Sequence, residues 1–131
     1  MTKNLLITGS LLAGISVVLG ALGAHWLKAN ISSAALTSFQ TGVHYQMFHA
    51  LAILLMAALP KKFHIKVFRF AFYAFLTGVI FFSGSIYLLS TREITGWSWS
   101  WMGPVTPLGG LMFIAGWILL IFTAVRVKNE T

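Results

Sequence analysis

The 131-residue sequence contains no cysteine, and this absence excludes several kinds of site. Disulfides, thiolate nucleophiles, cysteine-bound zinc and iron–sulfur clusters all require that residue. Acidic residues are nearly absent as well, since Glu93 and Glu130 are the only two. The sequence therefore lacks the carboxylate pair of common acid–base catalysts and the buried acid of most ion pathways. The favoured expectation is a chain with no catalytic residue, no metal site and no cofactor.

Charge of either sign is scarce, because 8% of the residues are charged and 58% are hydrophobic. An ordinary soluble domain with a charged surface cannot be built from this composition. The charged residues separate four long apolar segments, which are residues 5–27, 36–59, 67–90 and 104–125. Each has about the 20 residues that a helix needs to cross the hydrocarbon of a bilayer.

The four apolar segments predict an all-α fold, an integral membrane four-helix bundle in a single domain over residues 1–131. Backbone groups in lipid must be satisfied within each segment, and the runs are too long and continuous for the strands of a membrane barrel. The first segment resembles a signal peptide, with Lys3 before it and small residues at 21–24. It is longer than a usual signal core, so we expect it to remain as a membrane span.

The basic residues predict the orientation, because lysine and arginine near span ends stay on the cytoplasmic side. With four spans, both termini and the central loop share one face. That face holds seven of the nine basic residues, which are Lys3, Lys61, Lys62, Lys66, Arg69, Arg126 and Lys128. The other face holds Lys28 and Arg92. The expected orientation therefore puts both termini in the cytoplasm, at the inner face of a bacterial cytoplasmic membrane.

Two loops carry residues that favour the lipid headgroup region. Lys61, Lys62, Lys66 and Arg69 lie in the central loop and its flank, where they can bind anionic headgroups. A short loop between two spans is a poor platform for nucleic acid, so we expect no such partner. The loop before the fourth span has a tryptophan at every second position, Trp97, Trp99 and Trp101, which is typical of interfacial anchors.

Small residues predict where the helices pack, because association in lipid depends on close backbone approach and on polar contacts. Ser16, Gly20 and Ala24 follow one another at intervals of four on the first segment. On the third segment, Ala74 and Gly78 begin a similar stripe that Ser85 extends. Glycines elsewhere add to the expected packing surfaces, namely Gly23, Gly84 and Gly109. The same pattern permits a homo-oligomer or another membrane protein as partner.

The remaining polar chemistry collects in HYQMFHALAILL, residues 44–55, and at the end of the first segment. His44 and His49 are five residues apart, about 140° around a helix, so they cannot chelate one metal from one side. Gln46 and His49 are three apart and share a face. His25 lies near the outer end of the first segment, at a different depth from His49, which disfavours an axial pair on one haem.

Four motifs together resemble the domain of unknown function 423 family, small bacterial membrane proteins related to the eukaryotic transmembrane protein 256 group. The motifs are GALGAHWL (20–27), TGVHYQMFHALAIL (41–54), FFSGSIYLL (81–89) and VTPLGGLMFIAGW (105–117). The resemblance covers nearly the whole chain and implies four transmembrane helices. Its pattern implies a polar site at His25, Tyr45, Gln46, His49, Ser83 and Ser85, and small or turn residues at Gly23, Ala24, Gly84, Thr106, Pro107 and Gly109. It implies no established reaction.

Three interpretations of the intramembrane polar residues remain open at this point. In the first, Gln46 and His49 bond to neighbouring helices and fix the bundle, and the protein acts in membrane organisation or homeostasis through lipid or protein contacts. In the second, the polar groups line a path for a small solute or a proton. In the third, His49 or His25 binds haem or donates to a quinone.

Overall fold

The computed structural model describes residues 1–98 and 100–127, and the regular structure in this part of the chain is entirely helical. Four helical stretches are long and apolar enough to cross a membrane, at Thr2–Asn30, Ser33–Ala58, Lys66–Ser90 and Ser100–Arg126. The predicted all-α fold with four membrane spans is therefore confirmed.

Two of the four spans contain a π-helical turn. The first span consists of α1 (Thr2–Leu22), the π-helical turn η1 (Gly23–Leu27) and α2 (Lys28–Asn30). The third consists of α4 (Lys66–Gly78), the π-helical turn η3 (Val79–Ser83) and α5 (Gly84–Ser90). Such turns inside α-helices occur frequently at functional sites. The turn η1 lies within the motif at 20–27, and η3 overlaps the start of the motif at 81–89.

The second span is one helix, α3 (Ser33–Ala58), which begins at the N-cap Ser32, whose hydroxyl accepts from the Ala35 amide. The fourth span is mainly α7 (Val105–Arg126), which begins after Pro104, where a missing amide donor costs little. The connections contain the 3-10 turn η2 (Lys61–Phe63) and the short α6 (Arg92–Thr95), and the 3-10 turn η4 (Ser100–Met102) precedes α7 at the start of the fourth span.

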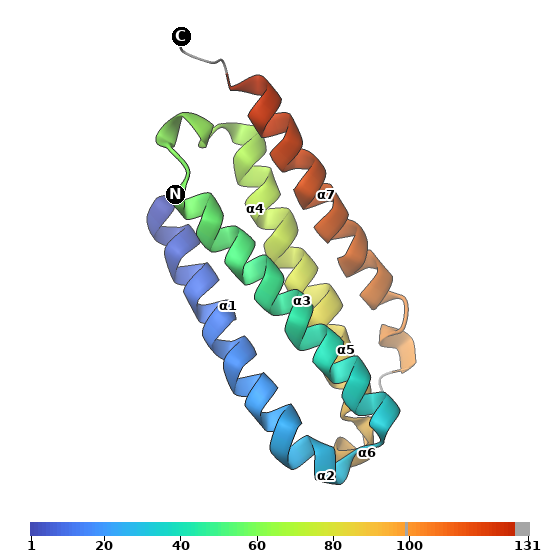
Figure 1. Ribbon diagram of the computed structural model, residues 1–131. Coiled ribbons are helices and arrows are strands. Elements are labelled where there is room, and N and C mark those ends of the chain that lie inside the picture. The colour runs from blue at the N-terminus through green and yellow to red at the C-terminus, as the bar shows by residue number, and fades with distance from the viewer. Residues whose placement is uncertain (99, 128–131) are drawn as a thin grey trace.

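Figure 1 shows the four spans running side by side, with α3 between α1 and the later helices. The main packing pairs are α1 with α3 and α4 with α7, while η3 and α5 pack on α3. The largest core cluster lies toward the end where α1 begins, and Phe68, Phe75 and Ile53 are fully buried in it. A smaller cluster of Leu27, Phe39 and Val43 closes the other end.

Glycine allows the closest approach of two helices. A Cβ atom at Gly109 of α7 would overlap the backbone of Phe82 in η3, and one at Gly78 of α4 would overlap the ring of Phe113. Both glycines were expected at packing surfaces, and both lie at them. Because backbone atoms cannot move aside as a side-chain end can, Gly109 is the more constrained position.

The expected stripe on the first span is partly wrong. Ser16 is buried, but Ala24 is exposed, and Gly23 is buried against Phe39 in its place. Gly23 follows Ser16 by seven residues, which brings it to within about 20° of the same helix face. Ala24 follows Ser16 by eight residues and is rotated by about 80° from that face. Gly20 lies between these positions, half-buried near Val43.

Gly84 was also expected to be a packing residue, and the structure contradicts this. A Cβ atom there would have no neighbour within 4 Å. Gly84 instead lines an apolar pocket of about 470 Å³, together with Leu88 and Trp101. The surface at Gly84 therefore borders a pocket, whereas the sequence pattern had indicated contact with another helix.

Candidate functional site

Gln46 is a buried amide that connects three helices. Its side chain is 3% exposed. The Nε2 group donates to the backbone carbonyl of Leu12 in α1 at 2.9 Å, and Oε1 accepts from the Tyr87 hydroxyl of α5 at 2.8 Å. Both ends of the amide are thus bound to other spans, so Gln46 fixes the position of α3 relative to α1 and α5.

His49, one turn further along α3, is buried and has a partner at each ring nitrogen. Trp117 of α7 donates its indole N–H to Nε2 at 3.2 Å, so Nε2 must be an acceptor. The proton then lies on Nδ1, which donates to the Tyr45 carbonyl at 2.7 Å. This arrangement holds a neutral imidazole and ties α3 to α7.

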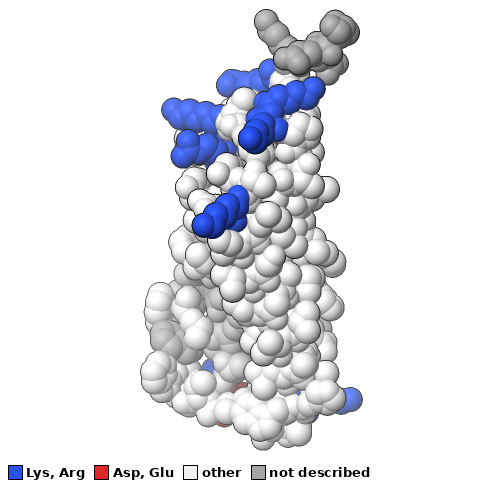
Figure 2. All heavy atoms as spheres, turned by 90° about the vertical axis from the view of Figure 1, so that its left-hand side faces the viewer, with Lys and Arg blue, Asp and Glu red and all other residues white. Residues whose placement is uncertain are grey.

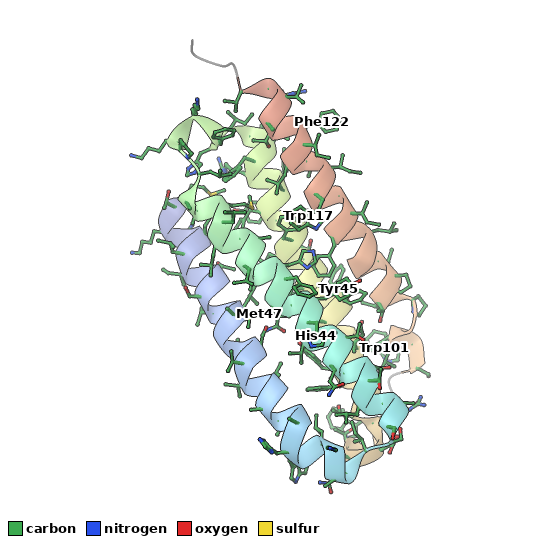
Figure 3. All side chains as sticks on the ribbon, viewed as in Figure 1. His44, Tyr45, Met47, Trp101, Trp117 and Phe122 are labelled. Atoms are coloured by element: carbon green, nitrogen blue, oxygen red, sulfur yellow. The ribbon has the colours of Figure 1, made fainter. Side chains whose placement is uncertain are left out.

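Aromatic rings enclose His49 on several sides. The Phe113 ring stacks on the imidazole, with ring centroids 3.6 Å apart and planes 7° from parallel. Phe75 and Tyr45 lie beside it, with centroids at 5.3 and 6.2 Å. Figure 3 places Tyr45 and Trp117 in the region between α3 and α7. This environment resembles a packed core rather than an open path through the protein.

Ser83 and Ser85 make further interhelical bonds, but not to Gln46 or His49. Ser83 donates to the carbonyl of Gly42 at 2.7 Å, and Ser85 shares a hydrogen bond of 2.5 Å with the Thr106 hydroxyl of α7. The two serines of the expected polar site therefore bond to other groups than Gln46 and His49. Since each span places its polar groups at a different depth, residue type alone does not determine the pairing.

Two members of the predicted polar site, His25 and Tyr45, contribute no side-chain hydrogen bond to this network among the described residues. The His25 side chain is exposed near the end of the first span, in η1. The Tyr45 ring is 41% exposed and packs against Phe82 at 4.7 Å between centroids. Tyr45 contributes through its backbone carbonyl instead. His44, the other histidine of the motif, is exposed on α3.

The sequence analysis missed Tyr87, Trp117 and the carbonyl of Leu12. A usable signal existed for Trp117, because it lies inside a span, whereas tryptophan prefers the interface, and its N–H usually finds a partner when buried. Tyr87 carried a similar signal through its hydroxyl. No sequence signal pointed to the Leu12 carbonyl. A helix carbonyl already accepts one hydrogen bond within its helix, and the residue type does not indicate whether a second donor bonds to it.

The basic side chains gather at one end of the molecule, as Figure 2 shows. This basic end is formed by Lys3 at the start of α1, by Lys61 and Lys62 in η2, by Lys66 and Arg69 in α4, and by Arg126 at the end of α7. The loop basic residues are exposed, and Lys62 and Lys66 lie over the rings of Phe63 and Phe70. Lys128, counted with them in the sequence, lies outside the described residues.

The opposite end carries the tryptophan loop. Trp97 and Trp101 are 64% and 65% exposed, which suits side chains in a headgroup layer. Trp99 lies outside the described residues. Among the described residues, no group of three His, Asp or Glu side chains is arranged to hold a metal ion.

The profile of the family described as "Protein of unknown function (DUF423)" matches residues 19–110. The chain belongs to this family. Similar relatives include the UPF0382 membrane protein YwdK of Bacillus subtilis, 39% identical over 95% of this chain and 98% of the relative. The UPF0382 inner membrane protein YgdD of Escherichia coli K12 is 36% identical over 99% of this chain and 96% of its own length. No solved structure matches the chain.

Family membership supports a membrane location for the protein. Its relatives are named membrane or inner membrane proteins, and four of its own helices are apolar enough to span a bilayer. It is therefore a multi-pass protein of the cell membrane. The matched region includes Gln46, His49 and Gly109 but ends before Trp117.

Proposed function

We propose that this protein is a non-enzymatic component of the cell membrane that acts in membrane organisation by binding anionic lipid at its basic end. The observation that carries the proposal is the convergence of six basic side chains from three spans and the central loop, which are Lys3, Lys61, Lys62, Lys66, Arg69 and Arg126. Each lysine or arginine near an anionic bilayer surface contributes about 1 kcal/mol of attraction.

The interior of the bundle supports the same interpretation. The buried polar side chains Gln46, His49, Ser83 and Ser85 all bond to neighbouring helices. Such bonds hold spans in register, which is a structural role. The enclosed imidazole favours this role over a solute path or a cofactor ligand.

The orientation of the basic end is part of the proposal, since anionic lipid is enriched on the cytoplasmic side. Because the chain has no cysteine, single cysteines can report on each loop. An impermeant thiol reagent on intact cells should label Ser98→Cys and leave Lys62→Cys protected. The reverse pattern would place the basic end outside and refute the orientation.

Lipid binding can be measured by native mass spectrometry of the purified protein. The spectra compare the binding of added cardiolipin or phosphatidylglycerol with the binding of phosphatidylcholine. We expect preferential binding of the anionic lipids, weakened by salt. Replacing Lys61, Lys62, Lys66 and Arg69 by Gln should weaken this binding by roughly fivefold for each charge removed.

Beside the single variant Lys62→Gln, the matched control is Lys28→Gln, which removes one basic side chain from the opposite end. Anionic lipid binding should change little in this variant. Equal loss in both variants would show that net charge, and not the basic end, attracts the lipid. The same spectra report the number of subunits and any retained protein partner, which tests the homo-oligomer expected from the small-residue stripes.

A further inference from the structure

A pocket of about 580 Å³ lies at the end of the molecule opposite the basic end. Parts of α3, α5, α6 and α7 form it. Its polar lining consists of five hydroxyl residues and two charged residues, which are Ser32, Ser38, Thr41, Ser90, Thr106, Arg92 and Glu93. Ile86 and Leu89 add apolar surface. The volume falls within the usual range of small-molecule sites.

Ser90 is the unusual member of this lining. Its side chain is 4% exposed, and its hydroxyl has no hydrogen-bond partner among the described residues. Buried hydroxyls in native proteins are nearly always paired, because an unpaired one loses its hydration without compensation. By contrast, Thr41 bonds to the Thr37 carbonyl and Thr106 to Ser85. Ser90 lines the pocket, and rotation of its side chain would present this covered, unpaired hydroxyl to a polar ligand.

Two opposite charges line the same pocket without neutralising each other. Arg92 and Glu93 form no ion pair within the part of the chain that the structure describes. The Glu93 carboxylate instead accepts from the backbone amide of Ser32 at 3.2 Å, which holds it near the start of α3. One fixed anion and one available guanidinium on the wall of one pocket complement a zwitterion.

We infer that this pocket binds a phosphoethanolamine group. Arg92 pairs with the phosphate, whose oxygens suit a guanidinium fork. Glu93 accepts from the primary ammonium, and Ser90 supplies a further hydrogen bond. The exposed Trp97 and Trp101 lie at the same end and are typical of headgroup depth, so a bilayer phosphatidylethanolamine is within reach. A soluble phosphoethanolamine presents the same chemistry.

The site is separate from the basic end, so its test is independent of the proposed function. Native mass spectrometry of the purified protein would compare palmitoyl-oleoyl phosphatidylethanolamine with the matching phosphatidylcholine and phosphatidylglycerol. The comparison is made in the variant with Lys61, Lys62, Lys66 and Arg69 replaced by Gln, so that phosphatidylglycerol bound at the basic end does not mask the result. Preference for phosphatidylethanolamine is expected there, because the quaternary ammonium of phosphatidylcholine donates no N–H bond and phosphatidylglycerol has no ammonium. A parallel titration with O-phosphoethanolamine tells the soluble source from the lipid.

Substitutions of the pocket residues test whether phosphatidylethanolamine binds in this pocket. Arg92→Gln should weaken phosphatidylethanolamine binding about tenfold, and Ser90→Ala should weaken it severalfold. Glu93→Gln should abolish the preference over phosphatidylcholine. Lys28→Gln, a basic residue at the same end that does not line the pocket, serves as the control and should bind like wild type.

Thermal unfolding in detergent checks that every variant is folded. Binding of neither phosphoethanolamine source would overturn the inference. It would also be overturned if Arg92→Gln and Ser90→Ala, both folded, bound phosphatidylethanolamine as wild type does, or if phosphatidylglycerol bound equally well and were lost in the same variants.

Discussion

The two faces of α3 pack differently, although apolar side chains lie on both. The inner face carries Gly42, Gln46 and His49 and is buried against all three other spans. The outer face carries Phe48 and Leu55, which are 60% and 68% exposed. In water, such side chains would mark a core; in lipid, they mark the surface that faces acyl chains.

The comparison shows which residues select the packed face in a membrane. Apolar side chains gain little by moving from lipid to protein, so they do not choose a side. Hydrogen-bonding groups and small residues determine which face is packed. Hydrogen-bonding groups need partners on other helices, and small residues allow two helices to approach closely. The following predictions alter one face at a time, beginning with the largest expected effect.

Gly109→Ala should be the most destabilising of these changes, by about 1–3 kcal/mol, because its methyl group would overlap the Phe82 backbone. Thermal unfolding in detergent measures this. The neighbouring Gly110→Ala is the matched control, since a Cβ atom there would lie 3.9 Å from the nearest Phe82 atom. Equal stability of the two variants would contradict the close contact.

Gln46→Leu should cost about 1–2 kcal/mol, since it removes bonds to two helices and leaves the Tyr87 hydroxyl without its acceptor. A double-mutant cycle with Tyr87→Phe should show coupling, because the second substitution removes the stranded hydroxyl. Additive losses in the cycle would mean that the two side chains do not interact.

His49→Leu should cost about 0.5–2 kcal/mol, because the Trp117 N–H loses its acceptor. His49→Asn should recover part of the loss, and His44→Leu on the exposed side should cost less than His49→Leu. Unfolding of the three variants in detergent gives the comparison. If His49→Leu were as stable as wild type but lost the cellular activity of the protein, His49 would be a functional site instead of a structural one.

Gly84→Ala should have the smallest effect, within about 0.5 kcal/mol, because the added methyl group meets no atom within 4 Å. Unfolding beside Gly109→Ala provides the measurement. A large loss at Gly84 would indicate a partner molecule over the apolar pocket, and subunit number by native mass spectrometry would identify a second copy.

The sequence by itself determined the number of spans and the asymmetry of charge. Both depend on composition along the chain: a segment of sufficient apolar length must be a helix in lipid, and the lysines and arginines lie between such segments. It also marked Gln46 and His49 as groups that need partners, since a polar side chain deep in a span is costly to leave unpaired.

Only the tertiary structure decided which partners those groups have. The Leu12 carbonyl, Tyr87 and Trp117 meet Gln46 and His49 because of the relative depth and rotation of four helices. A shift of one turn in any span would exchange these partners without changing its apolar character. For the same reason Gly109 packs and Gly84 does not, because the sequence gives each glycine its place on a helix but only the neighbouring backbone makes that place a contact.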